Sequence, residues 1–256
     1  MKWSNPGTSA AIDQSSEVKG KGWDDGGYAS ADGGLLSTGM EVREDTRVLS
    51  AKATKTGKGD EMVVVSVQKS FTTQGATAPA VVDRRDWLFL QPAPEPGSAV
   101  TDCAIVSTQP GPKPQMLKEA NGKYGFVHWR DHHQTPQSLF RFSALTFNAH
   151  RIHYDAAYAS TEGHRGAVVH GPLNLVLMLD LWRDVKTSGQ DSGEVALPTK
   201  DVEPIFPKRI EYRNTKPLYA GSWYRIGMGE EREGKTEVRV VDENGGTCVK
   251  GLIESW

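Results

Sequence analysis

The sequence predicts an α+β protein in which antiparallel strands surround one long buried helix. Segments in which apolar and polar side chains alternate, a pattern typical of strands, lie on both sides of a segment that is apolar on nearly every face. Turn signals rich in glycine separate neighbouring strand segments. A run of strands, one buried helix and further strands is typical of the α+β class.

Three strands are expected in the first part of the chain, after a tail. Residues 1–34 are rich in Gly, Ser and Asp, and we expect them to form a loop or a disordered segment. The strands are expected at residues 40–49, 62–71 and 79–90. The middle strand is the clearest, because its β-branched side chains favour extended backbone. These strands belong to a predicted N-terminal unit at residues 35–98.

A linker is expected between two units of the chain. Two proline-rich stretches, at residues 91–98 and 109–114, favour extended backbone. We therefore place the linker at residues 99–123 and a second unit at residues 124–256.

The second unit contains the predicted helix, at residues 170–183. Pro172 suits the first helical turn. Because Leu, Met and Val fill nearly every face of this segment, we expect the helix to be buried all round. Strands with a two-residue repeat follow it, the last two joined by a hairpin turn at Asn244. They lie at residues 209–214, 222–227, 236–242 and 247–254.

Composition narrows the function classes. The chain has 256 residues, of which 24% are charged and 37% apolar, and a formal net charge of −2. No basic excess points to nucleic acid, and no apolar run is long enough to span a bilayer. Cys103 and Cys248 stand in no metal-binding pattern, which suits a reducing compartment. The first forty residues carry acidic side chains and no arginine, so we expect a cytosolic protein, with a mitochondrial location as the alternative.

The candidate site is a cluster of polar residues that interrupts apolar segments. Asn148, His150 and His153 follow an apolar run, and His170 and Gly171 open the predicted helix. A histidine beside an amide can move protons near neutral pH. A backbone N–H at a helix N-terminus favours a negatively charged oxygen. Together these groups could carry acid–base chemistry at a polarised carbonyl.

Other roles are open for several of these residues. A lone histidine is more often structural than catalytic, and Asn148 could cap the following helix. We expect Asp155 to anchor or cap the segment that begins at Ala156. Arg151 could meet a substrate carboxylate or phosphate, or could be a solvated surface residue. The histidines of residues 128–133 match no metal signature, so we expect a surface loop there and no metal site.

The cluster resembles the motif of the R-specific enoyl-thioester hydratases of the MaoC-like family, which have the hot-dog fold. That motif reads Asp-x-Asn-Pro-x-His-x-Asp, followed by a His-Gly that opens the central helix. The stretch from Phe142 to Asp155 is more similar still to one branch, the mesaconyl-CoA hydratase-like proteins and the mitochondrial 3-hydroxyacyl-thioester dehydratases of eukaryotes. The resemblance covers about residues 35–255 as a double hot-dog. No long helix precedes Met40, so the first unit is expected to be reduced.

The resemblance implies roles for the matched residues. His153 would carry the proton, Asn148 would stand where the family has its Asp, and the Gly171 N–H would stabilise charge on the thioester oxygen. An amide cannot act as a base at neutral pH, so His153 would serve as both base and acid. The remaining matched positions are expected on the substrate side of the site: His150, Arg151, His170 and Pro172.

The activity implied is hydration or dehydration of an enoyl or 3-hydroxyacyl thioester carried by CoA or an acyl carrier, without a cofactor. A homodimer is expected by analogy. Two other functions stay open from the sequence. One is a specialised biosynthetic dehydratase or isomerase acting on a non-thioester, polyketide-derived intermediate. The other is a non-catalytic protein that binds acyl groups or CoA.

Overall fold

The computed structural model describes residues 36, 39–55, 59, 61–90, 111–189, 192–197 and 205–256, without the side chain of Leu90. The predicted tail at residues 1–34 lies outside these residues, as do Cys103 and most of the proline-rich stretches. None of the helices in the described part of the chain is long and apolar enough to cross a membrane.

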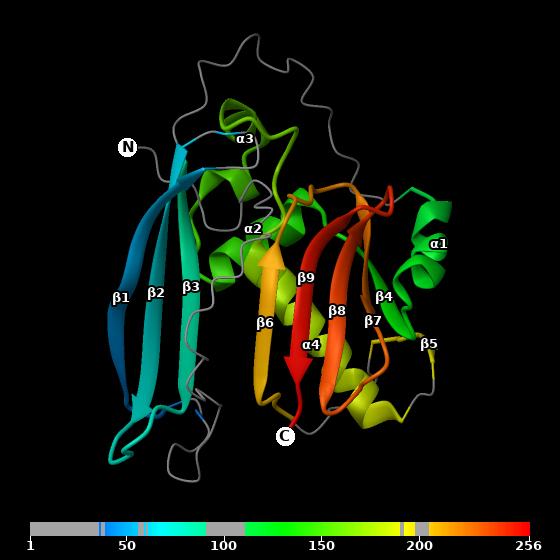
Figure 1. Ribbon diagram of the computed structural model, residues 1–256. Helices are drawn as coiled ribbons and strands as arrows, with labels where there is room; N and C mark the ends of the chain where they lie inside the picture. Colours follow the sequence, from blue (N-terminus) through cyan, green and yellow to red (C-terminus); the bar gives the residue numbers. More distant parts are fainter. Residues whose placement is uncertain are drawn as a thin grey trace.

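The first part of the chain forms a three-stranded antiparallel sheet in the order β1-β2-β3 (Figure 1). The strands are β1 Val42–Lys55, β2 Glu61–Thr73 and β3 Val81–Leu90. The three strand predictions are therefore confirmed. The first helix after β3 packs on the other sheet. The reduced first unit stays a prediction.

The second sheet has six strands in the order β5-β4-β7-β8-β9-β6. Every neighbouring pair is antiparallel except β4 and β5, which are parallel. The hairpin between β8 and β9 is tight because the Asp242 carboxylate accepts hydrogen bonds from the backbone N–H groups of Asn244 and Gly246. The bounds are β4 His128–His133, β5 Gly193–Glu194, β6 Arg209–Asn214, β7 Trp223–Met228, β8 Lys235–Asp242 and β9 Thr247–Glu254. The four predicted strands and the hairpin are confirmed.

The long helix α4, Gly171–Ser188, crosses one face of this sheet (Figure 1). Gly171, Asn174, Met178 and Leu181 form its buried row, with the three- and four-residue spacing of one helix face. The core between helix and sheet includes Met178 and Leu181 together with apolar side chains of β7, β8 and β9: Tyr224, Ile226, Val238, Val240 and Ile253.

The expectation that this helix is buried all round is wrong for its outward side. Val176 is 46% exposed, and Leu173 and Leu175 are only partly buried against the core. Only one face of α4 packs against the sheet, so its remaining apolar side chains are shielded incompletely.

Helix α1, Gln115–Tyr124, lies on the opposite face of the sheet from α4. Its buried residues Leu117 and Ala120 pack with Phe126 and Val241 rather than with the α4 core. This helix occupies the second half of the stretch predicted as a linker, 99–123. The boundary between the two units stays a prediction.

Residues 128–133 form strand β4 inside the sheet, so the expected surface loop there is wrong. The sequence of this strand is polar, and its charged residues fit inside the sheet because they have buried partners. Arg130 pairs with Asp184 at 2.9 Å on the α4 side, and Asp131 pairs with Arg225 at 2.7 Å on the α1 side. Each charge is neutralised by a residue far along the chain.

Candidate active site

Helix α2, Pro136–Leu145, leads the chain toward the polar cluster. A reciprocal capping box begins it: Ser138 N–H donates to the Thr135 hydroxyl, and Thr135 N–H donates to the Ser138 hydroxyl. The helix buries Leu139 and Ser143. Phe147 then adopts the left-handed conformation, with φ of 52°, which turns the backbone so that Asn148 N–H donates to the Ser143 carbonyl at 2.9 Å.

His153 is held in one tautomer by the backbone of a distant segment. The short helix η1, Arg151–His153, buries Ile152 and His153. Val168 N–H donates to the Ile152 carbonyl at 2.8 Å, and His153 Nδ1 lies 2.7 Å from the Val168 carbonyl oxygen. A carbonyl only accepts, so Nδ1 carries the proton, and the neutral ring keeps its lone pair on Nε2. That is the arrangement a histidine base needs.

The ring of His170 stacks on the ring of His153. Their centroids are 3.7 Å apart and their planes 17° from parallel. His170 Nε2 lies 2.9 Å from the hydroxyl of the buried Ser143, and Phe142 contacts the His170 ring edge-on. The stack joins α2, η1 and the start of α4, which are far apart in the sequence.

Burial keeps both imidazoles neutral at pH 7. It lowers the pKa of His153 to about 4, although the Val168 carbonyl acts in the opposite direction. Burial and the neighbouring His153 lower the pKa of His170 to about 3. A protonated His153 would also be repelled by His150 and His164. The pair therefore offers lone pairs rather than positive charge at neutral pH.

Gly171 and Pro172 are the first two residues of α4, as predicted, and His170 is the N-cap. Gly171 is buried, and the positive end of the helix dipole lies at this point. Since His170 stacks on His153 and Gly171 follows directly, the structure brings the imidazole of residue 153 and the start of the helix together.

Asn148 and His150 form a turn directly before η1. Asn148 Oδ1 accepts a hydrogen bond from His150 N–H at 3.2 Å. The Asn148 side chain therefore caps this turn and not helix α3, Ala156–Thr161. The His150 ring centroid is 6.1 Å from that of His153, and its Nδ1 is buried with no partner among the described residues.

Arg151 and Asp155 face outward from the cluster. Asp155 caps α3, because its carboxylate accepts a hydrogen bond from Tyr158 N–H at 2.9 Å, as the sequence led us to expect. It also forms an ion pair with Arg151, whose guanidinium lies over the Tyr158 ring. Arg151 is exposed and already paired in this state.

Comparison with known proteins identifies the family. The family model described as hydroxyacyl-thioester dehydratase type 2 matches residues 10–220. The chain belongs to this family.

Two curated relatives match parts of the chain. The mesaconyl-C(4)-CoA hydratase of Chloroflexus aurantiacus is 67% identical over 49 residues, which are 19% of this chain and 18% of that protein. The mitochondrial hydroxyacyl-thioester dehydratase type 2 of Schizosaccharomyces pombe is 35% identical over 97 residues, which are 38% of this chain and 28% of that protein. The matches thus span less than a third of either relative.

Solved structures show the same fold. A MaoC-like dehydratase superposes with a TM-score of 0.55 and 13% identity, over 86% of this chain and 71% of that chain. A MaoC-like dehydratase from Phytophthora capsici superposes with a TM-score of 0.52 and 16% identity, over 84% and 64% respectively. The α+β double hot-dog predicted from the sequence is confirmed.

Two buried polar residues of α2 and α4 were not singled out in the sequence. Ser143 lies inside the apolar stretch of α2, and Asn174 lies one turn into α4. Ser143 interrupts the apolar buried face of α2, and Asn174 interrupts the first part of the buried face of α4, which also holds the ion-paired Asp184 near its end. That interruption is the only sequence signal for them, and by itself it does not distinguish a site from a tolerated core residue.

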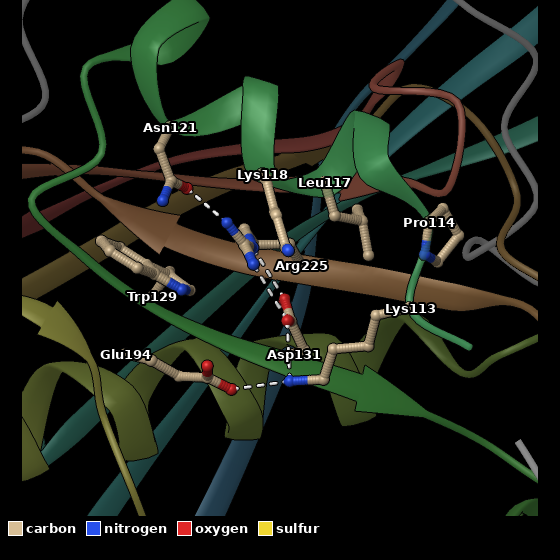
Figure 2. A pocket seen from close by; sticks show the side chains of 9 residues that line it. All are labelled: Lys113, Pro114, Leu117, Lys118, Asn121, Trp129, Asp131, Glu194 and Arg225. Carbon is tan, nitrogen blue, oxygen red and sulfur yellow. Dashed lines mark hydrogen bonds and ion pairs between the residues drawn. The ribbon is translucent and has the colours of Figure 1, made fainter. Parts of the chain in front are cut away.

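A cavity on the opposite face of the sheet is separate from this site. It measures about 230 Å³ and lies between α1 and strands β4 and β7. Figure 2 shows Asp131 at its centre, paired with Arg225 and with Lys113, which also pairs with Glu194. Burial raises the pKa of Asp131, but the hydrogen bonds and charges of Arg225 and Lys113 outweigh it and hold that pKa below its ordinary value. These charges largely neutralise one another and fasten α1 to the sheet.

No group of three or more His, Cys, Asp or Glu side chains within the described ranges is arranged to hold a metal ion.

Proposed function

We propose that the protein adds water to an enoyl thioester, or removes water from a 3-hydroxyacyl thioester, with His153 as acid and base. The observation that carries this proposal is the position of His153: a buried, neutral imidazole with its proton fixed on Nδ1, stacked at the N-terminus of α4. Membership of the dehydratase family supports it.

In the dehydration direction, the thioester oxygen accepts a hydrogen bond from the Gly171 N–H. The His153 Nε2 lone pair takes a proton from C2, and charge develops on the thioester oxygen, where the helix dipole stabilises it. The C2=C3 bond forms as the C3–O bond breaks. The proton on Nε2 passes to the departing hydroxyl, so water leaves and His153 is neutral again. Hydration is the reverse.

Asn148 would orient the hydroxyl or the water, because an amide donates and accepts hydrogen bonds but does not take a proton at neutral pH. His150, with an unpartnered buried Nδ1, and His170 would line the substrate side. Arg151 would have to leave Asp155 to reach a carrier phosphate. Pro172 would shape the helix entry. The acyl carrier is proposed to be CoA or a carrier protein, and the assembly a homodimer.

The test is hydration of crotonyl-CoA, which is monitored through the loss of the enoyl absorbance. We expect turnover by the wild-type protein and a loss of about 10²–10⁴-fold in His153→Gln, the range for removal of a positioned acid–base group. His133→Gln is the matched control: His133 lies on β4, on the α1 side of the sheet against Trp223, so it should keep full activity.

Equal activity in His153→Gln and the wild type would refute the proposal. Tight binding of CoA thioesters without turnover would favour the alternative of a non-catalytic protein that binds acyl groups or CoA. No reaction with thioesters, together with turnover of a non-thioester intermediate, would favour the alternative of a specialised dehydratase or isomerase.

A further inference from the structure

The first turn of α4 offers few backbone donors to a bound oxygen. Gly171 and Leu173 each supply an N–H, but Pro172 has none, and Asn174 N–H donates to the His170 carbonyl at 3.3 Å. Sites that stabilise an oxyanion commonly combine several preorganised donors. The proline therefore leaves the Gly171 N–H without a second donor at the adjacent position.

Asn174 is a further polar residue on the first turn of α4. Asn174 is only 4% exposed and stands three residues after Gly171, on the same face of the helix. The Cα–Cβ bond of a helical residue tilts toward the helix N-terminus. The Asn174 side chain is therefore expected to lean back over the turn that contains Gly171.

Asn174 Oδ1 is fully buried and has no hydrogen-bond partner in the part of the chain that the structure describes. A buried polar group without a partner costs free energy that an apolar side chain would avoid. The neighbouring positions of the same buried row, Met178 and Leu181, are apolar. A structural asparagine here would be expected to cap or bridge something, and this one does neither.

We propose that Asn174 is a further catalytic residue, whose side-chain N–H donates to the thioester oxygen together with the Gly171 N–H. This inference rests on the proposed hydratase function and adds a second oxyanion donor to it. An amide can present either end of its head group after a rotation of 180° at Cγ, so Nδ2 can face the substrate oxygen. The two donors would come from one helical turn and would stay fixed during the reaction.

The decisive variant is Asn174→Leu, which keeps the approximate volume and removes the donor. We expect kcat for crotonyl-CoA to fall by about 10²–10³-fold, the cost of losing one oxyanion donor, while KM changes little. The control Met178→Leu lies one turn further on the same row and should keep kcat. Since the leucine removes an unsatisfied polar group, the thermal midpoint of Asn174→Leu should be unchanged or higher by about 2–4 °C.

A spectroscopic measurement separates this inference from the hydratase proposal. Acetoacetyl-CoA carries an acidic C2–H, and its enolate absorbs in the near ultraviolet. We expect the wild-type protein to raise the enolate fraction of the bound thioester and Asn174→Leu to lower it. That result needs no turnover, so it holds even if crotonyl-CoA is not hydrated.

Three results would overturn the inference: full kcat in Asn174→Leu, an effect on KM alone, or a fall of kcat together with a lower thermal midpoint, which would mark a structural role. An unchanged enolate fraction in the variant would do the same. Absence of hydration by the wild-type protein would instead overturn the proposed function.

Discussion

Acid should destabilise this protein through His153 well before its carboxylates titrate. Burial lowers the pKa of His153 from its ordinary value of 6.5 to about 4. Below pH 6.5 the unfolded chain binds a proton at this residue, whereas the folded chain stays unprotonated there until about pH 4. The free energy of unfolding therefore decreases as the pH falls from 6.5 to 4. Above pH 6.5 this contribution to stability is fully present.

The size of the effect follows from the two pKa values. One shifted site lowers the free energy of unfolding by about 2 kcal/mol at pH 5 and by about 3 kcal/mol once the pH is well below 4. Urea unfolding at pH 7, 6 and 5 measures it. The quantity to compare is the drop between pH 7 and pH 5, because His153→Gln also removes the hydrogen bond to the Val168 carbonyl and lowers stability at every pH.

We expect the drop to be smaller by about 2 kcal/mol in His153→Gln than in the wild type. Part of the drop remains in the variant, since burial lowers the pKa of His132 to about 4 and that of His170 to about 3. Asn148→Ala, which removes no titrating group, should keep the wild-type drop. The same drop in His153→Gln and in the wild type would refute this reasoning.

Three further predictions concern neighbouring residues. Ser143→Ala leaves His170 Nε2 buried without its partner and should cost about 1–3 kcal/mol in urea unfolding; a neutral result would mean that the serine does not hold that ring. Asp131→Asn should destabilise by about 3–5 kcal/mol, because Arg225 and Lys113 lose a buried counter-charge. Its folded fraction should keep kcat/KM for crotonyl-CoA, and a loss would show that the two sheet faces are coupled. Asn148→Asp should keep the turn, since a carboxylate oxygen also accepts a hydrogen bond from His150 N–H, and its kcat should stay within about tenfold of the wild-type value. In Asn148→Leu, steady-state assays should show a kcat more than about tenfold below the wild-type value.

Local patterns predicted the strands and the long helix well. Strand β2 has a run of β-branched residues, and α4 has a largely apolar segment opened by Pro172, so each carries its own signal. The meeting of His153 with the start of α4 was implied by the family resemblance, because the family motif pairs this histidine with the His-Gly that opens the helix.

Strand β4 and the residues Ser143 and Asn174 could not be predicted in the same way. The charges of β4 are acceptable in a sheet only because Asp184 and Arg225 neutralise them, and these partners stand 54 and 94 positions away. Ser143 becomes informative only when His170, 27 positions later, is placed against it. Such pairings depend on tertiary structure, and no local pattern contains them.

The most direct test of the central claim is a crystal structure with butyryl-CoA, a saturated thioester that the enzyme cannot dehydrate. The proposed function predicts the thioester oxygen within hydrogen-bonding distance of the Gly171 N–H, about 2.7–3.2 Å, and C3 of the acyl chain beside His153 Nε2. An acyl group bound elsewhere, for instance in the cavity beneath α1, with His153 out of reach of C2 and C3, would contradict it.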